Sequence, residues 1–275
     1  MTTENTVEAT QRAGVPRVFW VGLVAIAVYV LIAAGLANVL ELLVKPATPV
    51  ADFALTHFVP LSLLIVAGVL FARKAGWLAA VWRDERAVAE APRRWWMLAV
   101  PLLLLVGPVA DLFDVPWGER GIGVVLLLLL GCVMVGFGEE FFYRGILRVS
   151  LRAHHGNFVT LLVTSVLFGI SHSLGSLLNG VPVSVIAFQV GATGLTGALY
   201  YVAFCATGRL WVPILIHAFT DFVLYAQSDL SVDSHEAAVP DRMPVKIPAA
   251  KIKPVTASTL PAWAAMRSFC ICRQG

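Results

Sequence analysis

The sequence predicts an all-α, polytopic transmembrane helical bundle with about seven spans. Composition supports this fold class, because 59% of the 275 residues are hydrophobic and only 13% are charged, whereas soluble domains carry roughly 25% charged residues. Their distribution supports it too, because the apolar residues gather in runs of roughly 20, the length that crosses a bilayer as a helix. The basic residues fall in short segments between these runs and form no patch suited to nucleic acid.

Each apolar run accounts for one expected span. The first is longer than the roughly 7–15-residue apolar core of a signal peptide, so we expect a retained helix, with a cleaved signal as the alternative. The expected spans cover Val18–Leu40, Phe53–Ala72, Trp95–Phe113, Gly121–Tyr143, Phe158–Leu178, Val183–Phe204 and Leu210–Ala226.

Four regions follow from this division. Residues 1–17 are polar and are predicted to form a disordered cytoplasmic N-terminus. Residues 18–120 hold the N-terminal transmembrane helices, and residues 121–228 form a transmembrane core that contains all three polar motifs. Residues 229–275 are predicted to be a polar extension, because their proline-bearing, aperiodic sequence is typical of weakly ordered chain.

Basic residues between the spans predict the orientation of the bundle. Residues 73–94 and 144–155 are rich in arginine, and such loops face the cytoplasm. Alternation then places the N-terminus and Arg209 on the same side. Arg144, Arg148 and Arg152 recur at four-residue spacing, and this stripe is predicted to face lipid headgroups.

Glu139, Glu140 and Arg144 follow an apolar run with no charged residue between positions 121 and 138. An ionisable group at the centre of a membrane helix costs about 2.5–3.5 kcal/mol or more, so this cluster indicates a functional site. Glu140 and Arg144 lie four residues apart, share a helix face and are predicted to pair. Glu139 then has no local partner, which suits a general base acting on water.

Two further polar pairs occur in later spans. Phe168 and His172 share one helix face, and His217 and Asp221 share another at the same four-residue spacing. A carboxylate at that distance either fixes the tautomer of an imidazole or joins it as a ligand of one metal ion.

Taken singly, each group has a structural explanation: an ion pair, a hydrogen-bonded core histidine and an interfacial helix pair. A rise of 1.5 Å per residue, however, places Glu139 roughly 13 Å from Arg148 and His217 roughly 12 Å from Arg209, on the same side. His172 lies deeper, at about 16–22 Å from the start of its own helix. These depths permit a shared site in the cytoplasmic half of the bilayer.

The motifs Glu139-Glu140-x-x-x-Arg144, Phe168-x-x-x-His172 and His217-x-x-x-Asp221 resemble, in order, those of the CAAX protease and bacteriocin-processing family. This family comprises type II CAAX prenyl endopeptidases and Abi-type relatives, which are intramembrane proteases. The resemblance covers residues 121–226. It implies that Glu139 activates water with the help of His172, that Glu140 and Arg144 form a supporting pair beside Phe168, and that His217 with Asp221 stabilises the oxyanion or completes a metal site.

One departure bears on the chemistry. Many relatives carry asparagine where this chain has Asp221, and an ionised aspartate cannot donate a hydrogen bond to an oxyanion. A metal-dependent mechanism, with a divalent ion such as zinc on His172, His217 and Asp221, and a glutamate-type mechanism therefore both stay open.

The resulting hypothesis is an intramembrane endopeptidase in which residues 121–228 form the catalytic core. Its expected partners are the lipid bilayer and a membrane-associated peptide or lipidated protein, without nucleic acid. Its expected location is the bacterial inner membrane, with the site open to the cytoplasm. The alternatives are a non-catalytic scaffold or bacteriocin-immunity protein and, ranked last, a proton-coupled transporter.

Overall fold

The computed structural model describes residues 14–83, 95–178 and 180–228, and every regular element within these ranges is a helix. This confirms the predicted fold class. The predicted disorder of residues 1–17 falls largely, and that of residues 229–275 entirely, outside the described residues.

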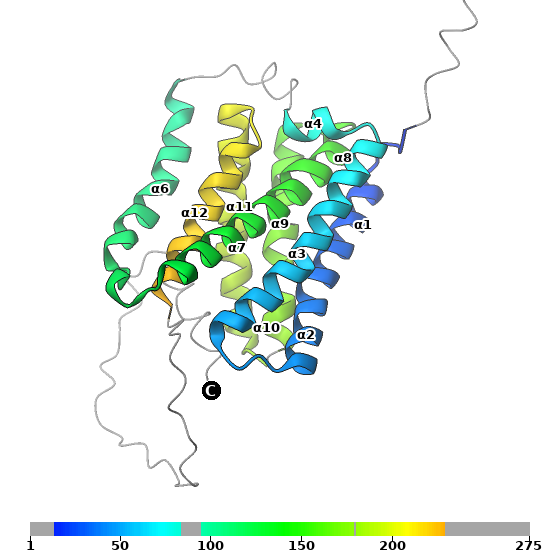
Figure 1. Ribbon diagram of the computed structural model, residues 1–275. Coiled ribbons are helices and arrows are strands. Elements are labelled where there is room, and N and C mark those ends of the chain that lie inside the picture. Colours follow the sequence, from blue (N-terminus) through cyan, green and yellow to red (C-terminus); the bar gives the residue numbers. More distant parts are fainter. Residues whose placement is uncertain (1–13, 84–94, 179, 229–275) are drawn as a thin grey trace, which may run out of the picture.

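Within each described range the helices follow one another along the chain with short turns between them (Figure 1). In order they are α1 (Phe19–Val30), the π-helical η2 (Leu31–Leu36), α2 (Ala37–Val44), α3 (Pro49–Lys74), α4 (Leu78–Trp82), the 3₁₀ turn η3 (Trp95–Leu98), α6 (Ala99–Asp111), the 3₁₀ turns η4 (Leu112–Asp114) and η5 (Trp117–Glu119), α7 (Ile122–Glu140), the π-helical η6 (Phe141–Leu147), α8 (Arg148–Arg152), α9 (Asn157–Ser171), α10 (Ser173–Leu178), α11 (Val183–Thr207) and α12 (Trp211–Gln227).

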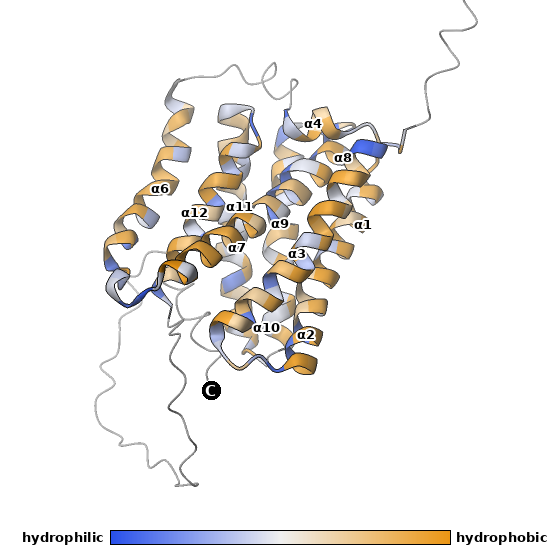
Figure 2. Cartoon of the chain, viewed as in Figure 1, coloured by the Kyte–Doolittle hydropathy of each residue, from blue (hydrophilic) through white to orange (hydrophobic). Residues whose placement is uncertain are grey.

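Six helical segments of the described chain are long and apolar enough to cross a membrane. They are Phe19–Val44, Pro49–Lys74, Trp96–Asp114, Ile122–Arg152, Asn157–Leu177 and Val183–Thr207. The seventh predicted span corresponds to α12, which has 17 residues and is not among the six. Figure 2 shows hydrophobic residues along most of each long helix.

The apolar surface of the bundle is that of an integral membrane protein. Large hydrophobic side chains project outward from α2, α6 and α9, and Leu43, Leu103 and Phe158 are among the most exposed. In water such a surface would promote association, whereas in a bilayer it contacts lipid. The charged residues Glu140 and Arg144, by contrast, are fully buried.

The helix that carries the first motif is longer than the sequence predicted. α7, η6 and α8 run without a break from Ile122 to Arg152 and cross the bundle diagonally in Figure 1. The predicted loop over residues 144–155 is therefore wrong, and the turn occupies only residues 153–156. The π-helical segment η6 begins directly after Glu140, and such segments are frequent at functional sites.

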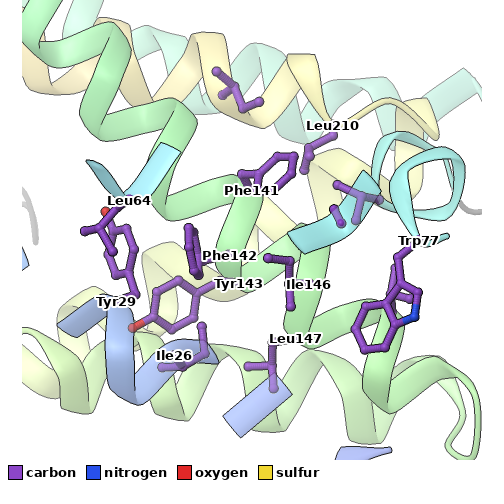
Figure 3. Close-up of a cluster of buried hydrophobic side chains, with 14 of the residues drawn as sticks. Ile26, Tyr29, Leu64, Trp77, Phe141, Phe142, Tyr143, Ile146, Leu147 and Leu210 are labelled. Atoms are coloured by element: carbon purple, nitrogen blue, oxygen red, sulfur yellow. The ribbon is translucent and has the colours of Figure 1, made fainter. Parts of the chain in front are cut away.

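The largest buried cluster surrounds η6 (Figure 3). Phe141, Ile146 and Leu147 have no solvent exposure, and α1, α3 and α4 supply the residues that cover them, including Ile26, Leu64 and Val81. Because apolar side chains cover η6 on these sides, the first motif is held in a rigid part of the bundle.

Glycines allow two pairs of helices to approach closely. A Cβ atom on Gly136 of α7 would lie 2.8 Å from the carbonyl oxygen of Ile214 in α12. One on Gly169 of α9 would lie 2.4 Å from the carbonyl oxygen of Val190 in α11. Small residues at such contacts are typical of membrane helix packing, and here they bring α7 against α12 and α9 against α11.

Candidate active site

Three helices bring four titratable side chains to one place in the bundle. Glu139 lies at the end of α7, His172 in the turn between α9 and α10, and His217 and Asp221 on α12. The Oε2 atom of Glu139 is 3.7 Å from Nε2 of His172 and 3.8 Å from Nε2 of His217. The Oδ2 atom of Asp221 is 3.4 Å from Nε2 of His217.

Glu140 is buried next to this group and contacts both Arg144 and His217. Its Oε1 atom is 3.1 Å from Nη1 of Arg144, and neither side chain is exposed. The same oxygen lies 3.0 Å from Nδ1 of His217. Nη2 of Arg144 donates to the carbonyl oxygen of Gly197 at 2.5 Å. Glu140 therefore connects the predicted ion pair on α7 and η6 directly to the histidine on α12.

Both imidazoles direct Nε2 toward the carboxyl group of Glu139. Nδ1 of His172 is 2.7 Å from the carbonyl oxygen of Phe168, which can only accept, so Nδ1 carries the proton. Nδ1 of His217 likewise donates to Glu140, because a carboxylate paired with Arg144 is an acceptor. A partner at Nδ1 thus orients each ring and leaves Nε2 facing the site.

Glu139 faces both imidazoles at distances longer than a hydrogen bond. Its Oε2 atom is buried and accepts no hydrogen bond from the described residues. The side chain is 16% exposed, against 32% for His172 and 21% for Asp221, so the group is partly open at the surface of the bundle. Catalytic hydrogen bonds are often long before substrate binds, and the two Glu139–imidazole distances fit this pattern.

Aromatic rings enclose the buried side of the site. The guanidinium carbon of Arg144 lies 4.3 Å from the centre of the Phe168 ring, a distance suited to a cation–π contact. Phe168 also lies 4.8 Å from the His172 ring and 6.0 Å from the His217 ring. Tyr200 of α11 stacks on His217 at 4.8 Å.

The charges in the cluster require a counterbalance. Three carboxyl groups, those of Glu139, Glu140 and Asp221, face one permanent cation, Arg144. Because unpaired buried charges are costly, protons on the carboxyl groups or imidazoles, or a bound cation, must offset the difference.

The donor types of the cluster suit zinc, which takes imidazole nitrogen and carboxylate oxygen. Within the part of the chain that the structure describes, no group of three or more His, Cys, Asp or Glu side chains is found placed to hold a metal ion. Zinc on His172, His217 and Asp221 stays an untested prediction.

The predicted arginine stripe is wrong. Arg144, Arg148 and Arg152 are all buried, with at most 7% exposure. Arg148 donates from Nε to the carbonyl oxygen of Arg144 at 2.5 Å and from Nη2 to that of Ala80 at 2.5 Å. Protein carbonyl groups, not lipid headgroups, therefore satisfy this side chain.

The residues of the three motifs lie close together, as their depths in the sequence suggested. Three further contacts of the site were not predicted. Pairing of Glu140 with His217 was not expected, because they are 77 positions apart. Gly197 and Tyr200 were not expected either, because they lie in an apolar span where hydropathy gives no sign of a polar neighbour.

The motif region also matches a known family. Residues 121–223 match the family model described as type II CAAX prenyl endopeptidase Rce1-like. The resemblance inferred from the three motifs is thereby confirmed, and the matched region contains Glu139, His172, His217 and Asp221. Comparisons with curated proteins and with solved structures gave no significant match.

Proposed function

We propose that the protein is an intramembrane endopeptidase in which Glu139 activates water to attack a peptide bond. The arrangement that carries this proposal is the carboxyl group of Glu139 opposite two oriented Nε2 atoms, with no hydrogen bond to its Oε2 atom from a described residue. The match of residues 121–223 to a family of prenyl endopeptidases supports the reaction class.

In this mechanism a water molecule binds between Glu139 and the Nε2 atoms of His172 and His217. Glu139 takes a proton from the water molecule while the water oxygen bonds to the carbonyl carbon of the substrate. The tetrahedral intermediate collapses when the carbon–nitrogen bond breaks, and the protonated Glu139 returns the proton to the leaving amine. General-base catalysis of this kind contributes about 10²–10⁴-fold in rate.

Asp221 would act through His217. Its Oδ2 atom lies 3.4 Å from Nε2 of that residue, so the carboxylate would stabilise a protonated His217 electrostatically, and the Nε2–H group would donate to the developing oxyanion. This role is available to an aspartate, whereas direct donation to the oxyanion is not unless the carboxyl group carries a proton.

The proposed substrate is a membrane-associated peptide or lipidated protein. The site lies among helices that cross the bilayer, so a substrate tethered to the membrane reaches it without leaving the lipid phase. The family description names prenyl endopeptidases, which makes a prenylated CAAX peptide the first probe. The proposed location is the bacterial inner membrane, with the site open to the cytoplasm.

The proposal predicts that Glu139→Ala abolishes cleavage. The purified protein in liposomes is given an internally quenched prenylated CAAX peptide and, separately, an unprenylated leader-type peptide. The unsubstituted protein is expected to cleave at least one of them, and Glu139→Ala to be slower by about 10²-fold or more. Glu119→Ala, a substitution at an exposed glutamate outside the site, is the matched control.

Undiminished cleavage by Glu139→Ala, or no cleavage of either probe by the unsubstituted protein, contradicts the proposal. If a biological activity of the protein survives both Glu139→Ala and His172→Ala, the scaffold or immunity alternative is favoured instead.

A further inference from the structure

Tyr200 stacks on the imidazole of His217, although it belongs to none of the three motifs. The two ring centres are 4.8 Å apart and the ring planes differ by 24°. Phe168 approaches the same imidazole nearly edge-on, with 75° between the planes. Tyr200 is 2% exposed, so its ring is part of the bundle interior and not of the lipid-facing surface.

The in-plane contacts of His217 hold its two nitrogens but not the faces of its ring. Nδ1 donates to Glu140, and Nε2 lies 3.4 Å from Oδ2 of Asp221. The torsion that turns a histidine ring has broad, shallow minima, so rotation would swing Nε2 away from Glu139 and Asp221. Packing against a face of the ring is what prevents such rotation, and Tyr200 supplies that face.

Tyr200 is itself held firmly in place. Its ring belongs to a buried cluster with Ala203 of α11 and Ile216 of α12, and side chains from α6 pack against this cluster. Because neighbours from α6, α11 and α12 pack around the Tyr200 ring, this ring cannot shift to follow the imidazole. The position of Tyr200 therefore sets the plane of the His217 ring.

The same face of α11 contacts both partners of Glu140. The carbonyl group of Gly197 accepts from Arg144, and the Tyr200 ring lies 5.8 Å from the guanidinium carbon of Arg144 as well as against His217. Positions three apart share a helix face. α11 therefore takes part in the site through a carbonyl group and a ring, without a motif residue of its own.

From this geometry we infer that Tyr200 is a positioning residue, whose ring sets the plane of His217 so that Nε2 stays directed at Glu139. The inference rests on the proposed endopeptidase function. Because Tyr200 acts on the orientation of a catalytic group and does not touch substrate, its loss should lower kcat and leave KM nearly unchanged.

Three variants test this in liposomes with the peptide probe that the unsubstituted protein cleaves. Tyr200→Leu removes the ring and is expected to lower kcat at least tenfold, with KM within twofold. Tyr200→Phe keeps the ring and is expected to retain kcat within twofold. Tyr201→Leu is the matched control: Tyr201 is also buried, but its hydroxyl donates to Asn157, and we expect kcat within threefold.

Unchanged kcat in Tyr200→Leu overturns the inference, and so does an equal loss in Tyr200→Phe, which would assign the effect to the hydroxyl group. If Tyr200→Leu fails to fold, as judged by size-exclusion chromatography, Tyr200→Met fills similar space without a ring and is judged by the same criterion. Glu139→Ala is measured alongside. Cleavage by that variant defeats the proposed function, whereas an inactive Glu139→Ala with an unaffected Tyr200→Leu defeats only the role of Tyr200.

Discussion

Arg144 holds two contacts of the site at once, because its guanidinium group pairs with Glu140 and donates to the carbonyl oxygen of Gly197. Glu140 in turn orients His217. The supporting pair is therefore not a separate structural feature beside the site. The pair positions the imidazole of His217 through Glu140. Removing the arginine would leave a buried carboxylate without its cation.

Arg144→Ala is predicted to destabilise the protein by about 3–5 kcal/mol, the typical cost of breaking a buried ion pair from one side. The measurement is equilibrium unfolding in detergent. Arg73→Ala, at an exposed arginine near the end of α3, is the control, and such surface changes usually alter stability by no more than about 0.5 kcal/mol. Equal stability of the two variants would show that Glu140 does not depend on Arg144.

Removing metal ions distinguishes a metal-dependent mechanism from a glutamate-type mechanism, both of which the motifs allow. The proposed general-base mechanism predicts that cleavage continues within about twofold after dialysis against a chelator, because Glu139 acts on water directly. Loss of cleavage on chelation, with recovery on adding zinc and about one zinc per chain by elemental analysis, would instead support zinc on His172, His217 and Asp221.

At the scale of elements, the site depends on how closely α9 approaches α11. Gly169 lies three residues before His172, and a Cβ atom there would meet the backbone carbonyl of Val190 at 2.4 Å. Backbone cannot move aside as a flexible side chain can, so the two helices would have to separate. Separation would carry His172 away from Glu139.

Gly169→Ala is therefore predicted to lower cleavage at least tenfold, even though alanine favours a helix by about 1 kcal/mol over glycine. The matched control is Gly191→Ala on α11, where an added Cβ atom meets nothing within 4 Å and activity should be retained. Both variants are assayed in liposomes with the same peptide probe. If the two behave alike, the close approach of α9 and α11 is not required.

The elements show where sequence reasoning succeeds and where it stops. Apolar runs predicted the long helices well, because burial in lipid imposes the length and the composition of a span. The same reasoning ended the fourth span at Tyr143, whereas the helix continues to Arg152. Hydropathy cannot tell a cation that faces lipid headgroups from one that donates to buried carbonyl groups, as Arg148 does.

Local spacing was similarly informative only within one helix. It predicted that Glu140 pairs with Arg144, because both residues lie on one face. It did not predict that Glu140 also binds His217 or that Tyr200 stacks on that ring, because these contacts join different helices. Such contacts depend on helix rotation and packing, which a single sequence does not specify.

At the scale of the whole molecule, the two ends of the continuous helix Ile122–Arg152 must lie on opposite sides of the membrane if this helix spans it. The segment before α7 includes Gly118, and the turn after α8 includes His154. The excess of basic residues near His154 predicts a cytoplasmic location for that turn. The predicted orientation can therefore be tested at these two positions.

In a cysteine-free background, Gly118→Cys in intact cells should react with a membrane-impermeant thiol reagent, and His154→Cys should react only after the cells are opened. Labelling is read by gel shift, and labelling of both variants in opened cells shows that each site is reachable. The reverse pattern would place the basic turn outside and would contradict the proposed cytoplasmic opening.

The central claim is that Glu139 and His217, from two separate helices, work as one catalytic unit. A double-mutant cycle tests it most directly, by comparing kcat for Glu139→Ala, His217→Ala and the double variant in liposomes. Groups that act as a unit are strongly non-additive, so the double variant should be no slower than the slower single variant within about threefold. If the two losses multiply instead, the two residues act independently and the account is contradicted.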